Sequence, residues 1–299
     1  MTKTVLVLGA GGLFGGHAAT AFANAGWQVR RYKRCTDMTA AAMGAEVIVN
    51  ALNPPNYHAW ATLIPEITDQ VIAAGLASGA TVIVPGNVYV YGNQPGPWGS
   101  DTPHRPVSRK GEVRAQMEAT YRAASDRGLC TIILRGGDFL APGSGRAVMD
   151  ILVLKHLARG KVTAIGDSSA KRAYAYLPDM TRAAVALAER RDSLPAFADI
   201  PFAGDVFSVR DLARALERLS GRTLKITQFP WITLRLAAPF WELAREFLEM
   251  RYLYDLPHSL DPAPLRALLP DFHPTPLDDI LRAHLPVVQG SEMSTQTGR

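Results

Sequence analysis

Near the start of the chain, a glycine-rich stretch has residue types and spacing that could bind phosphate. It reads VLVLGAGGLFGG from Val5 to Gly16, and Gly9, Gly12 and Gly15 lie three residues apart. Glycine permits a tight turn, lets a diphosphate approach the backbone and lets a following helix pack closely. The helix N-terminus adds N–H groups and the positive end of its dipole. A glycine turn used only for packing is the competing interpretation. The predicted dinucleotide contacts are Gly9, Gly12, Leu13, Phe14 and Gly15.

A short basic segment, Arg30 to Arg34, ends the second predicted strand. An NAD site usually has an acidic residue at this point, which binds the adenosine ribose. Here no carboxylate follows until Asp37. A guanidinium group can grip a 2′-phosphate through two hydrogen bonds, whereas a carboxylate would repel it. We therefore expect NADP(H) in preference to NAD(H), with a solvated strand end as the alternative. The candidate 2′-phosphate ligands are Arg31, Lys33 and Arg34.

The elements that must position these residues alternate between strand and helix in the first half of the chain. Apolar runs predict strands at Thr4–Leu8, Gln28–Tyr32, Glu46–Leu52, Thr81–Val84 and Cys130–Leu134. Helical patterns lie at His17–Ala25, Pro65–Ser78 and Glu112–Arg127. Continuous apolar strands separated by helices indicate a parallel sheet covered on both faces. The expected fold class is therefore α/β, with a doubly wound parallel sheet of the Rossmann type.

The regular alternation of strands and helices ends after the fifth predicted strand. A glycine- and proline-rich loop is expected over Gly136–Gly145, followed by shorter elements. The expected helices are Val148–Arg159, Met180–Arg190 and Val209–Ser220, and the expected strands are Lys161–Ile165, Ala173–Leu177 and Leu224–Thr227, with a short strand-and-turn piece at Pro201–Val206. The apolar helical region Trp231–Leu253 is most often core, with a lid or a partner interface as alternatives. Val287–Arg299 lacks periodicity and is expected to be a disordered tail.

Composition narrows the class of protein. The chain has 299 residues and a formal net charge of +5, without a long block of like charges, so a nucleic-acid-binding tail is not expected. Its two cysteines, Cys35 and Cys130, do not form a disulfide framework, which favours a reducing cytoplasm. No apolar stretch is long enough for a membrane span. The seven histidines show no metal-binding spacing, so no metal is expected. The expected partner is a small-molecule substrate, and a homodimer is left open.

Six segments in this order resemble the extended short-chain dehydrogenase/reductase superfamily, of the NAD-dependent epimerase/dehydratase type. The resemblance covers roughly residues 3–285. The glycine turn and the V-Y-G segment are its most specific parts. The segments are GAGGLFG (Gly9–Gly15), VNALNPP (Val49–Pro55), PGNVYVYGNQ (Pro85–Gln94), KGEVRAQME (Lys110–Glu118), ILRGGDFLAPG (Ile133–Gly143) and AYLPDMTRAAVAL (Ala175–Leu187).

The resemblance implies two domains with the substrate in the cleft between them. Residues 1–142 plus about 174–207 would form the dinucleotide-binding Rossmann domain. Residues 143–173 plus 208–286 would form a smaller mixed α/β substrate domain, with the tail at 287–299. Further cofactor contacts are expected at the ends of the third, fourth and fifth strands and in the next helix. They are Ala51, Leu52, Asn53, Pro85, Gly86, Lys110, Arg114 and Gly136.

The chain departs from the family where the family places its catalytic residues. Members carry a Ser or Thr after the fourth strand and a Tyr-x-x-x-Lys pair in the following helix. Here Asn87 falls on the Ser or Thr position, Lys110 on the tyrosine and Arg114 on the lysine. None of the nine tyrosines has a lysine four residues later. The usual tyrosinate mechanism therefore cannot be written, and the chain groups with atypical members of the family.

A redox reaction remains possible because a bound nicotinamide coenzyme supplies the hydride itself. The protein then needs donors for the developing oxyanion. Asn87 could donate through its amide, and Lys110 could protonate or stabilise the oxygen. Tyr91 is a further candidate donor, together with Tyr89. The competing interpretation is that Lys110 only binds the coenzyme or is exposed to solvent.

Three functions stay open at this point. The first is an NADP(H)-dependent oxidoreductase that reduces a small carbonyl or quinone-like substrate. The second is a non-catalytic, NmrA-like regulator that senses NADP(H). The third is a nucleotide-sugar epimerase or dehydratase, which the missing Ser and Tyr count against.

Overall fold

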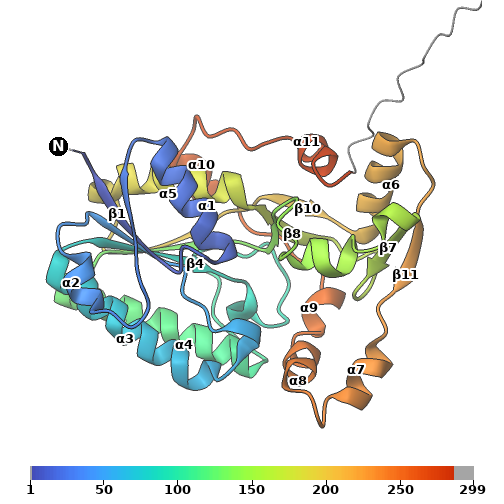
Figure 1. Cartoon of the computed structure of the whole chain (residues 1–299), viewed down its shortest axis with the longest axis horizontal. Helices are drawn as coiled ribbons and strands as arrows, with labels where there is room; N and C mark the ends of the chain where they lie inside the picture. The colour runs from blue at the N-terminus through green and yellow to red at the C-terminus, as the bar shows by residue number, and fades with distance from the viewer. Residues whose placement is uncertain (1, 286–299) are drawn as a thin grey trace, which may run out of the picture.

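The central feature of the protein, described here by a computed structural model over residues 2–285, is a six-stranded parallel sheet (Figure 1). Its strands are β1 (Thr4–Leu8), β2 (Gln28–Arg31), β3 (Val47–Asn50), β4 (Thr81–Gly86), β5 (Thr131–Arg135) and β9 (Phe197–Pro201). They are ordered β2-β1-β3-β4-β5-β9. Every neighbouring pair is parallel. The predicted doubly wound α/β class is therefore confirmed.

Helices cover both faces of this sheet (Figure 1). One face carries α1 (Leu13–Asn24) and α5 (Leu177–Glu189), and the other carries α2 (Met38–Ala42), α3 (Trp60–Ser78) and α4 (Arg109–Ala124). Every residue of β1, β3 and β5 is buried as a result. Two apolar cores, one on each face, fix the carboxyl ends of these strands at one edge of the sheet.

The sixth strand is placed differently from the sequence-based prediction. The sequence pattern predicted a short strand-and-turn piece at 201–206, whereas the structure has two strands, β9 at Phe197–Pro201 and β10 at Asp205–Phe207. The apolar run is interrupted by Asp199, which hides the strand in the sequence. The structure pairs Asp199 with Arg135 of β5, so a charged residue is accommodated inside the sheet. The chain returns to the first sheet through α5 and β9.

A second, smaller set of strands follows the first sheet. Three strands, β10, β8 (Arg172–Tyr176) and β6 (Asp138–Leu140), form one sheet, and β7 (Lys161–Ala164) pairs with β11 (Lys225–Gln228). The strand β6 lies inside the predicted loop. The helix expected over 148–159 is instead one π-helical turn at Met149–Val153 and one 3-10 turn at Leu157–Arg159. The helix α6 (Val209–Ser220) has its predicted bounds and begins with a Ser208–Asp211 capping box.

The apolar region Trp231–Leu253 is not one helix. It forms α7 (Trp231–Ala237), α8 (Glu242–Glu249) and the start of α9 (Tyr252–Asp255), and Pro239 separates the first two because it lacks a backbone N–H. The core interpretation is wrong for α7, in which no residue is fully buried. Two short helices, α10 (Ala263–Leu268) and α11 (Leu277–Arg282), complete the described chain. The predicted tail at 287–299 lies outside the described residues.

No helix within residues 2–285 is both long enough and apolar enough to cross a membrane.

Candidate functional site

A cavity of about 440 Å³ opens at the carboxyl ends of the central strands. The order of strands reverses between β1 and β3, and open α/β sheets bind ligands at such a switch point. Residues that follow four neighbouring strands line the cavity. These segments are Gly12–Phe14 after β1, Asn50–Asn53 after β3, Val84–Asn87 at β4 and Gly136–Phe139 after β5.

The glycine turn is packed so closely against neighbouring backbone that two of its positions have no room for a side chain. Gly9 has a φ of +75°, and a Cβ there would lie 2.6 Å from the carbonyl oxygen of Ala51. A Cβ on Gly15 would lie 2.2 Å from the carbonyl oxygen of Gly9. Gly12 caps α1 without a side-chain hydrogen bond, and no acidic residue lies in the first helical turn. The N–H groups at this end of α1 are therefore available to an anion.

The basic segment after β2 lies at the same edge of the sheet. Arg31 pairs in register with Val7, and the N–H of Tyr32 donates to the carbonyl oxygen of Val7. Arg30 is used structurally, since its guanidinium donates to the carbonyl oxygens of Met43 and Gly44. The three predicted 2′-phosphate ligands are exposed beside the glycine turn and do not line the cavity itself. They are Arg31, Lys33 and Arg34.

Asn87 lines the cavity and is fixed by its own loop. Its Oδ1 accepts a hydrogen bond from the N–H of Tyr89 at 3.0 Å, which leaves the amide NH₂ group as the end that can serve a ligand. Tyr89 lines the cavity as well, and its hydroxyl oxygen lies 3.4 Å from that of Tyr57. Three hydrogen-bonding side chains therefore converge on one part of the cavity.

Arg114 is a buried cation in the cavity wall. Its guanidinium stacks on Trp60, 4.7 Å from the ring centre, and donates from Nη2 to Oδ1 of Asn53. No carboxylate among residues 2–285 pairs with it, and its Nε lacks a hydrogen-bond partner. Burial lowers the pKa of Arg114, because it disfavours the charged form of the guanidinium. The side chain thus places a buried positive charge in the wall of the cavity.

The predicted catalytic residues Lys110 and Tyr91 do not line this cavity. The Lys110 ammonium forms ion pairs with Glu246 and Glu249 of α8. It lines a smaller pocket of about 130 Å³ beside the ring of Tyr57. The Tyr91 hydroxyl donates to the carbonyl oxygen of Gly99, inside a separate apolar cluster. The structure thus brings Asn87 to the cavity and places the other two predicted catalytic side chains elsewhere.

Two charged residues after β5 complete the cavity wall. Asp138 forms an ion pair with Arg172 of β8 at 2.7 Å. Arg146 comes from the glycine- and proline-rich loop, and its Nη1 donates to the carbonyl oxygen of Gly11 at 3.0 Å. Sequence reasoning missed Arg146 and Tyr57 as site residues. The only signal for either was its position in a loop that follows a central strand.

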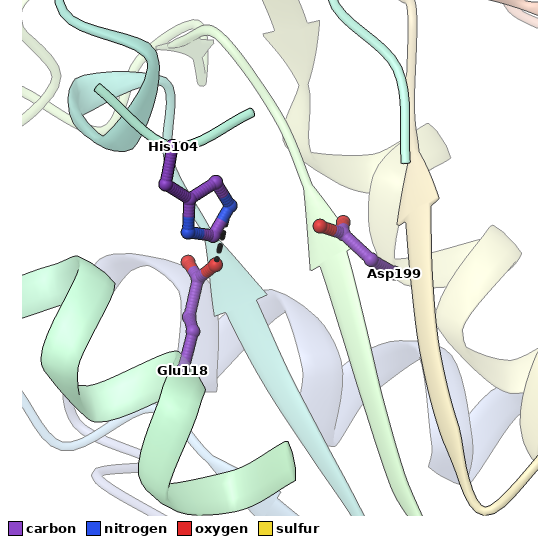
Figure 2. Close-up of side chains that lie close together, drawn as sticks. All are labelled: His104, Glu118 and Asp199. Atoms are coloured by element: carbon purple, nitrogen blue, oxygen red, sulfur yellow. Dashed lines mark ion pairs between the residues drawn. The ribbon is translucent and has the colours of Figure 1, made fainter. Parts of the chain in front are cut away.

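A cluster of His104, Glu118 and Asp199 lies close to this site (Figure 2). Such side chains could hold a metal, but Arg135 already donates to Glu118 at 2.6 Å and to Asp199 at 2.7 Å. Burial lowers the pKa of Arg135, and the two carboxylates more than offset this, so the pKa is raised overall. Because Arg135 also donates to the backbone oxygen of Asn87, we assign the cluster a structural role beneath the cavity.

Of the predicted cofactor contacts, most line the cavity. Three others lie behind its wall or beside it, in the glycine turn and α4: Gly9, Gly15 and Lys110. The residues that line it are Gly12, Leu13, Phe14, Ala51, Leu52, Asn53, Pro85, Gly86, Arg114 and Gly136.

The fold is that of a Rossmann-type α/β protein, with a cavity at the switch point of the sheet. Residues 65–200 match the model of the NAD dependent epimerase/dehydratase family. The matched stretch is slightly less than half of the 299 residues, and over it the resemblance to the epimerase/dehydratase type is confirmed. No curated protein matches the chain by sequence.

Solved structures of this type share the fold over nearly the whole chain. MoeE5 in complex with UDP-glucose and NAD is 20% identical, with 94% of this chain and 97% of that chain covered and a TM-score of 0.74. UDP-glucuronic acid 4-epimerase from Bacillus cereus, with UDP-glucuronic acid and NAD, is 18% identical, with 94% and 98% covered and a TM-score of 0.74. UDP-glucose 4-epimerase from Brucella ovis, with NAD, is 18% identical, with 94% and 97% covered and a TM-score of 0.72.

Proposed function

We propose that the chain is a nicotinamide-dinucleotide-dependent oxidoreductase that reduces a small carbonyl or quinone-like substrate. One observation carries this proposal. A single cavity joins the glycine turn, which suits a diphosphate, to a group of hydrogen-bond donors at Asn87, Tyr89 and Tyr57. Dinucleotide binding and oxyanion stabilisation are the two tasks that reduction of a carbonyl requires of a protein.

The cavity wall supplies fitting groups along the length of a dinucleotide. The free N–H groups of α1 would hold the diphosphate. The segment Ala51–Asn53 and the Arg114 side chain in the cavity wall would lie beside a ribose. When bound, the reduced nicotinamide supplies a hydride. The chain's own task is to orient the substrate and to donate hydrogen bonds to its oxygen, for which the Asn87 amide is placed.

We further propose that NADP(H) is preferred to NAD(H). The solved neighbours named above contain NAD, so this preference depends on this chain's own residues. Arg31, Lys33 and Arg34 are exposed at the end of β2, beside the glycine turn. No carboxylate precedes Asp37 in this segment, and Asp37 caps α2 by accepting from the N–H of Ala40.

The second candidate function is a nucleotide-sugar epimerase or dehydratase. It is favoured by the neighbours, two of which are described as bound to a UDP-sugar. It is disfavoured by the residues at the positions where the family carries its catalytic Ser or Thr and Tyr, which are Asn87 and Lys110 here. A third candidate, a non-catalytic sensor, would bind the same coenzyme without turnover.

Calorimetry and a substrate panel distinguish these functions. Titration with NADPH, NADP⁺, NADH and NAD⁺ should show binding, with NADPH tighter than NADH by about tenfold or more. Wild-type protein should then oxidise NADPH in the presence of at least one aldehyde, ketone or quinone. Binding without turnover would favour the sensor. Turnover or thermal protection by UDP-glucose or UDP-glucuronic acid alone would favour the epimerase, and no binding of any coenzyme would overturn the proposal.

A further inference from the structure

Two tyrosine hydroxyl groups meet inside the cavity. Tyr89 follows β4 and Tyr57 follows β3, so both come from the edge of the sheet at which the cavity opens. Their hydroxyl oxygens lie 3.4 Å apart. Asn87 lies two residues before Tyr89 and is hydrogen-bonded to its N–H. The pair is therefore built into the same cavity that we assign to coenzyme and substrate.

The backbone at Tyr57 is held in an unfavourable conformation. Its φ is +61°, in the left-handed region that residues with a side chain rarely adopt. The ring is fixed by two contacts, with Trp60 at 5.0 Å between ring centres and with the Lys110 ammonium at 5.1 Å from the ring centre. Backbone strain of this kind persists where packing imposes it and occurs often at ligand sites. The packing thus holds the Tyr57 hydroxyl against Tyr89.

The surroundings of the two phenols keep both hydroxyl groups protonated. Burial raises the pKa of Tyr89 well above its ordinary value, and burial raises that of Tyr57 as well. Both groups therefore carry their protons at neutral pH. The charges of Lys110 and Arg114 act in the opposite direction on Tyr57 and favour its anionic form. For Tyr89, the charge of Asp138 adds to the effect of burial and favours the protonated form.

Building on the proposed function, we propose that Tyr89 is the proton donor to the substrate oxygen and that Tyr57 is its positioning residue. The pair would replace the tyrosine that the family carries in the helix equivalent to α4. In this chain that position is taken by Lys110, which is engaged by Glu246 and Glu249. The proton donor thus comes from the loop after β4, in place of α4.

The reduction balances in protons and electrons. A bound reduced nicotinamide supplies a hydride, with its two electrons, to the carbonyl carbon, and the carbon–oxygen double bond becomes a single bond. The Tyr89 O–H bond breaks as its proton moves to the substrate oxygen, which forms the new O–H bond. The Tyr57 hydroxyl then donates its hydrogen bond to the Tyr89 oxygen. Solvent later returns one proton to Tyr89.

The test compares two classes of carbonyl, because the need for a proton donor depends on the basicity of the oxygen formed. Reduction of 4-nitrobenzaldehyde produces an alkoxide-like oxygen, which needs a proton early. Reduction of 9,10-phenanthrenequinone produces a phenolate-like oxygen, which is a much weaker base. We expect Tyr89→Phe to lower kcat by about 100-fold with the aldehyde and by less than about fivefold with the quinone. Tyr57→Phe should follow the same trend with a loss of about tenfold on the aldehyde.

Matched controls separate this role from a structural one. Tyr176→Phe changes a half-buried tyrosine outside the cavity and should leave both rates unchanged. Calorimetric Kd values for NADPH should stay within about twofold for all variants, because neither phenol is proposed to bind the coenzyme. A distorted site would instead lower both rates equally or weaken NADPH.

Other results of these experiments would overturn either the role of Tyr89 or the proposed function. Equal losses on aldehyde and quinone, or an active Tyr89→Phe, overturn the inference and leave the proposed function standing. A loss confined to Tyr91→Phe, the other candidate from the sequence, also overturns it. A wild-type protein that reduces no carbonyl of the panel removes the proposed function and this inference together.

Discussion

Arg146 donates a hydrogen bond from Nη1 to the carbonyl oxygen of Gly11, 3.0 Å away, although the two residues are 135 positions apart in the chain. This contact joins the loop after β5 to the glycine turn after β1. The loop is itself braced, because Asp150 accepts hydrogen bonds from the Ser144 hydroxyl and the Gly145 N–H. Arg146 has no carboxylate partner within residues 2–285. Its charge thus adds to the positive end of α1 at the place proposed for a diphosphate.

From this arrangement we predict that Arg146→Gln weakens NADPH binding by about tenfold. The loss should be smaller at high salt than at low salt, since screening weakens an exposed charge–phosphate contact. Calorimetric titrations at two ionic strengths would measure it. Arg159→Gln, which alters an exposed arginine outside the cavity, is the matched control. An unchanged Kd for Arg146→Gln would show that Arg146 only braces the glycine turn.

Coenzyme choice should depend on the basic segment after β2. We predict that the triple variant Arg31→Ala, Lys33→Ala, Arg34→Ala raises the Kd for NADPH by about 100-fold and that for NADH by less than about threefold. The difference arises because only NADPH carries the 2′-phosphate. Arg127→Ala removes an exposed arginine before β5, at the opposite edge of the sheet, and should change neither Kd. Equal weakening of both coenzymes by the triple variant would refute the predicted preference.

The sequence predicts this fold well because its strands are almost entirely apolar. The strands β1, β3 and β5 are buried at every residue, so their patterns carry a clear signal. The strand β9 was misplaced because Asp199 interrupts it, and the carboxylate is tolerated only through Arg135, which is distant in the sequence. The exposure of α7 was missed because its sequence is apolar. Its apolar residues resemble core, yet Ile232 and Leu236 are about three-quarters exposed.

The site was predictable where it depends on backbone, and less so where it depends on side chains. Glycine spacing located the turn because Gly9 and Gly15 have no room for a Cβ. The choice between Tyr89 and Tyr91 was beyond the sequence, since both lie in one 3-10 turn and only the packing shows which one lines the cavity. Likewise, the acidic partners of Lys110 come from α8, more than a hundred residues later.

Two glycines of the opening turn should differ in their sensitivity to replacement by alanine. A Cβ on Gly15 would lie 2.2 Å from the carbonyl oxygen of Gly9, whereas a Cβ on Gly11 would meet nothing within 4 Å. We therefore predict that Gly15→Ala lowers the free energy of unfolding by about 1–3 kcal/mol and weakens coenzyme binding. Gly11→Ala should change stability by less than about 0.5 kcal/mol. Urea unfolding measures both, and equal effects would contradict the geometry of the turn.

In the ion-pair cluster beneath the cavity, replacing Asp199 should lower the free energy of unfolding far more than replacing His104. Asp199→Ala removes one of the two carboxylates that pair with the fully buried Arg135. We therefore expect a loss of about 3 kcal/mol in the free energy of unfolding. His104 is partly exposed and lies 3.5 Å from Glu118. Burial lowers the pKa of His104, so it is largely neutral at pH 7 and its replacement by Ala should cost less than about 1 kcal/mol. Similar losses for the two variants would argue against Arg135 as the centre of the cluster.

Asp205 in β10 should reduce stability at neutral pH. Burial raises the pKa of Asp205 to about 6, and the nearby charge of Asp179 adds to this. In the unfolded chain the same carboxyl titrates near ~4, so between these two values the folded protein holds a proton that the unfolded chain has released. Stability therefore falls as the pH rises through this interval and stays lower above it.

Asp205→Asn removes this titration while keeping the shape of the side chain. We expect its melting temperature to exceed that of the wild type by about 2 °C at pH 7, a small gain because the group is partly exposed to solvent. The gain should vanish near pH 4, where Asp205 is protonated in the folded wild type. Asp192→Asn, at a carboxylate that is 89% exposed, should show no such pH dependence. A variant that melts below the wild type at pH 7 would mean that the Asp205 charge stabilises the fold through a favourable contact.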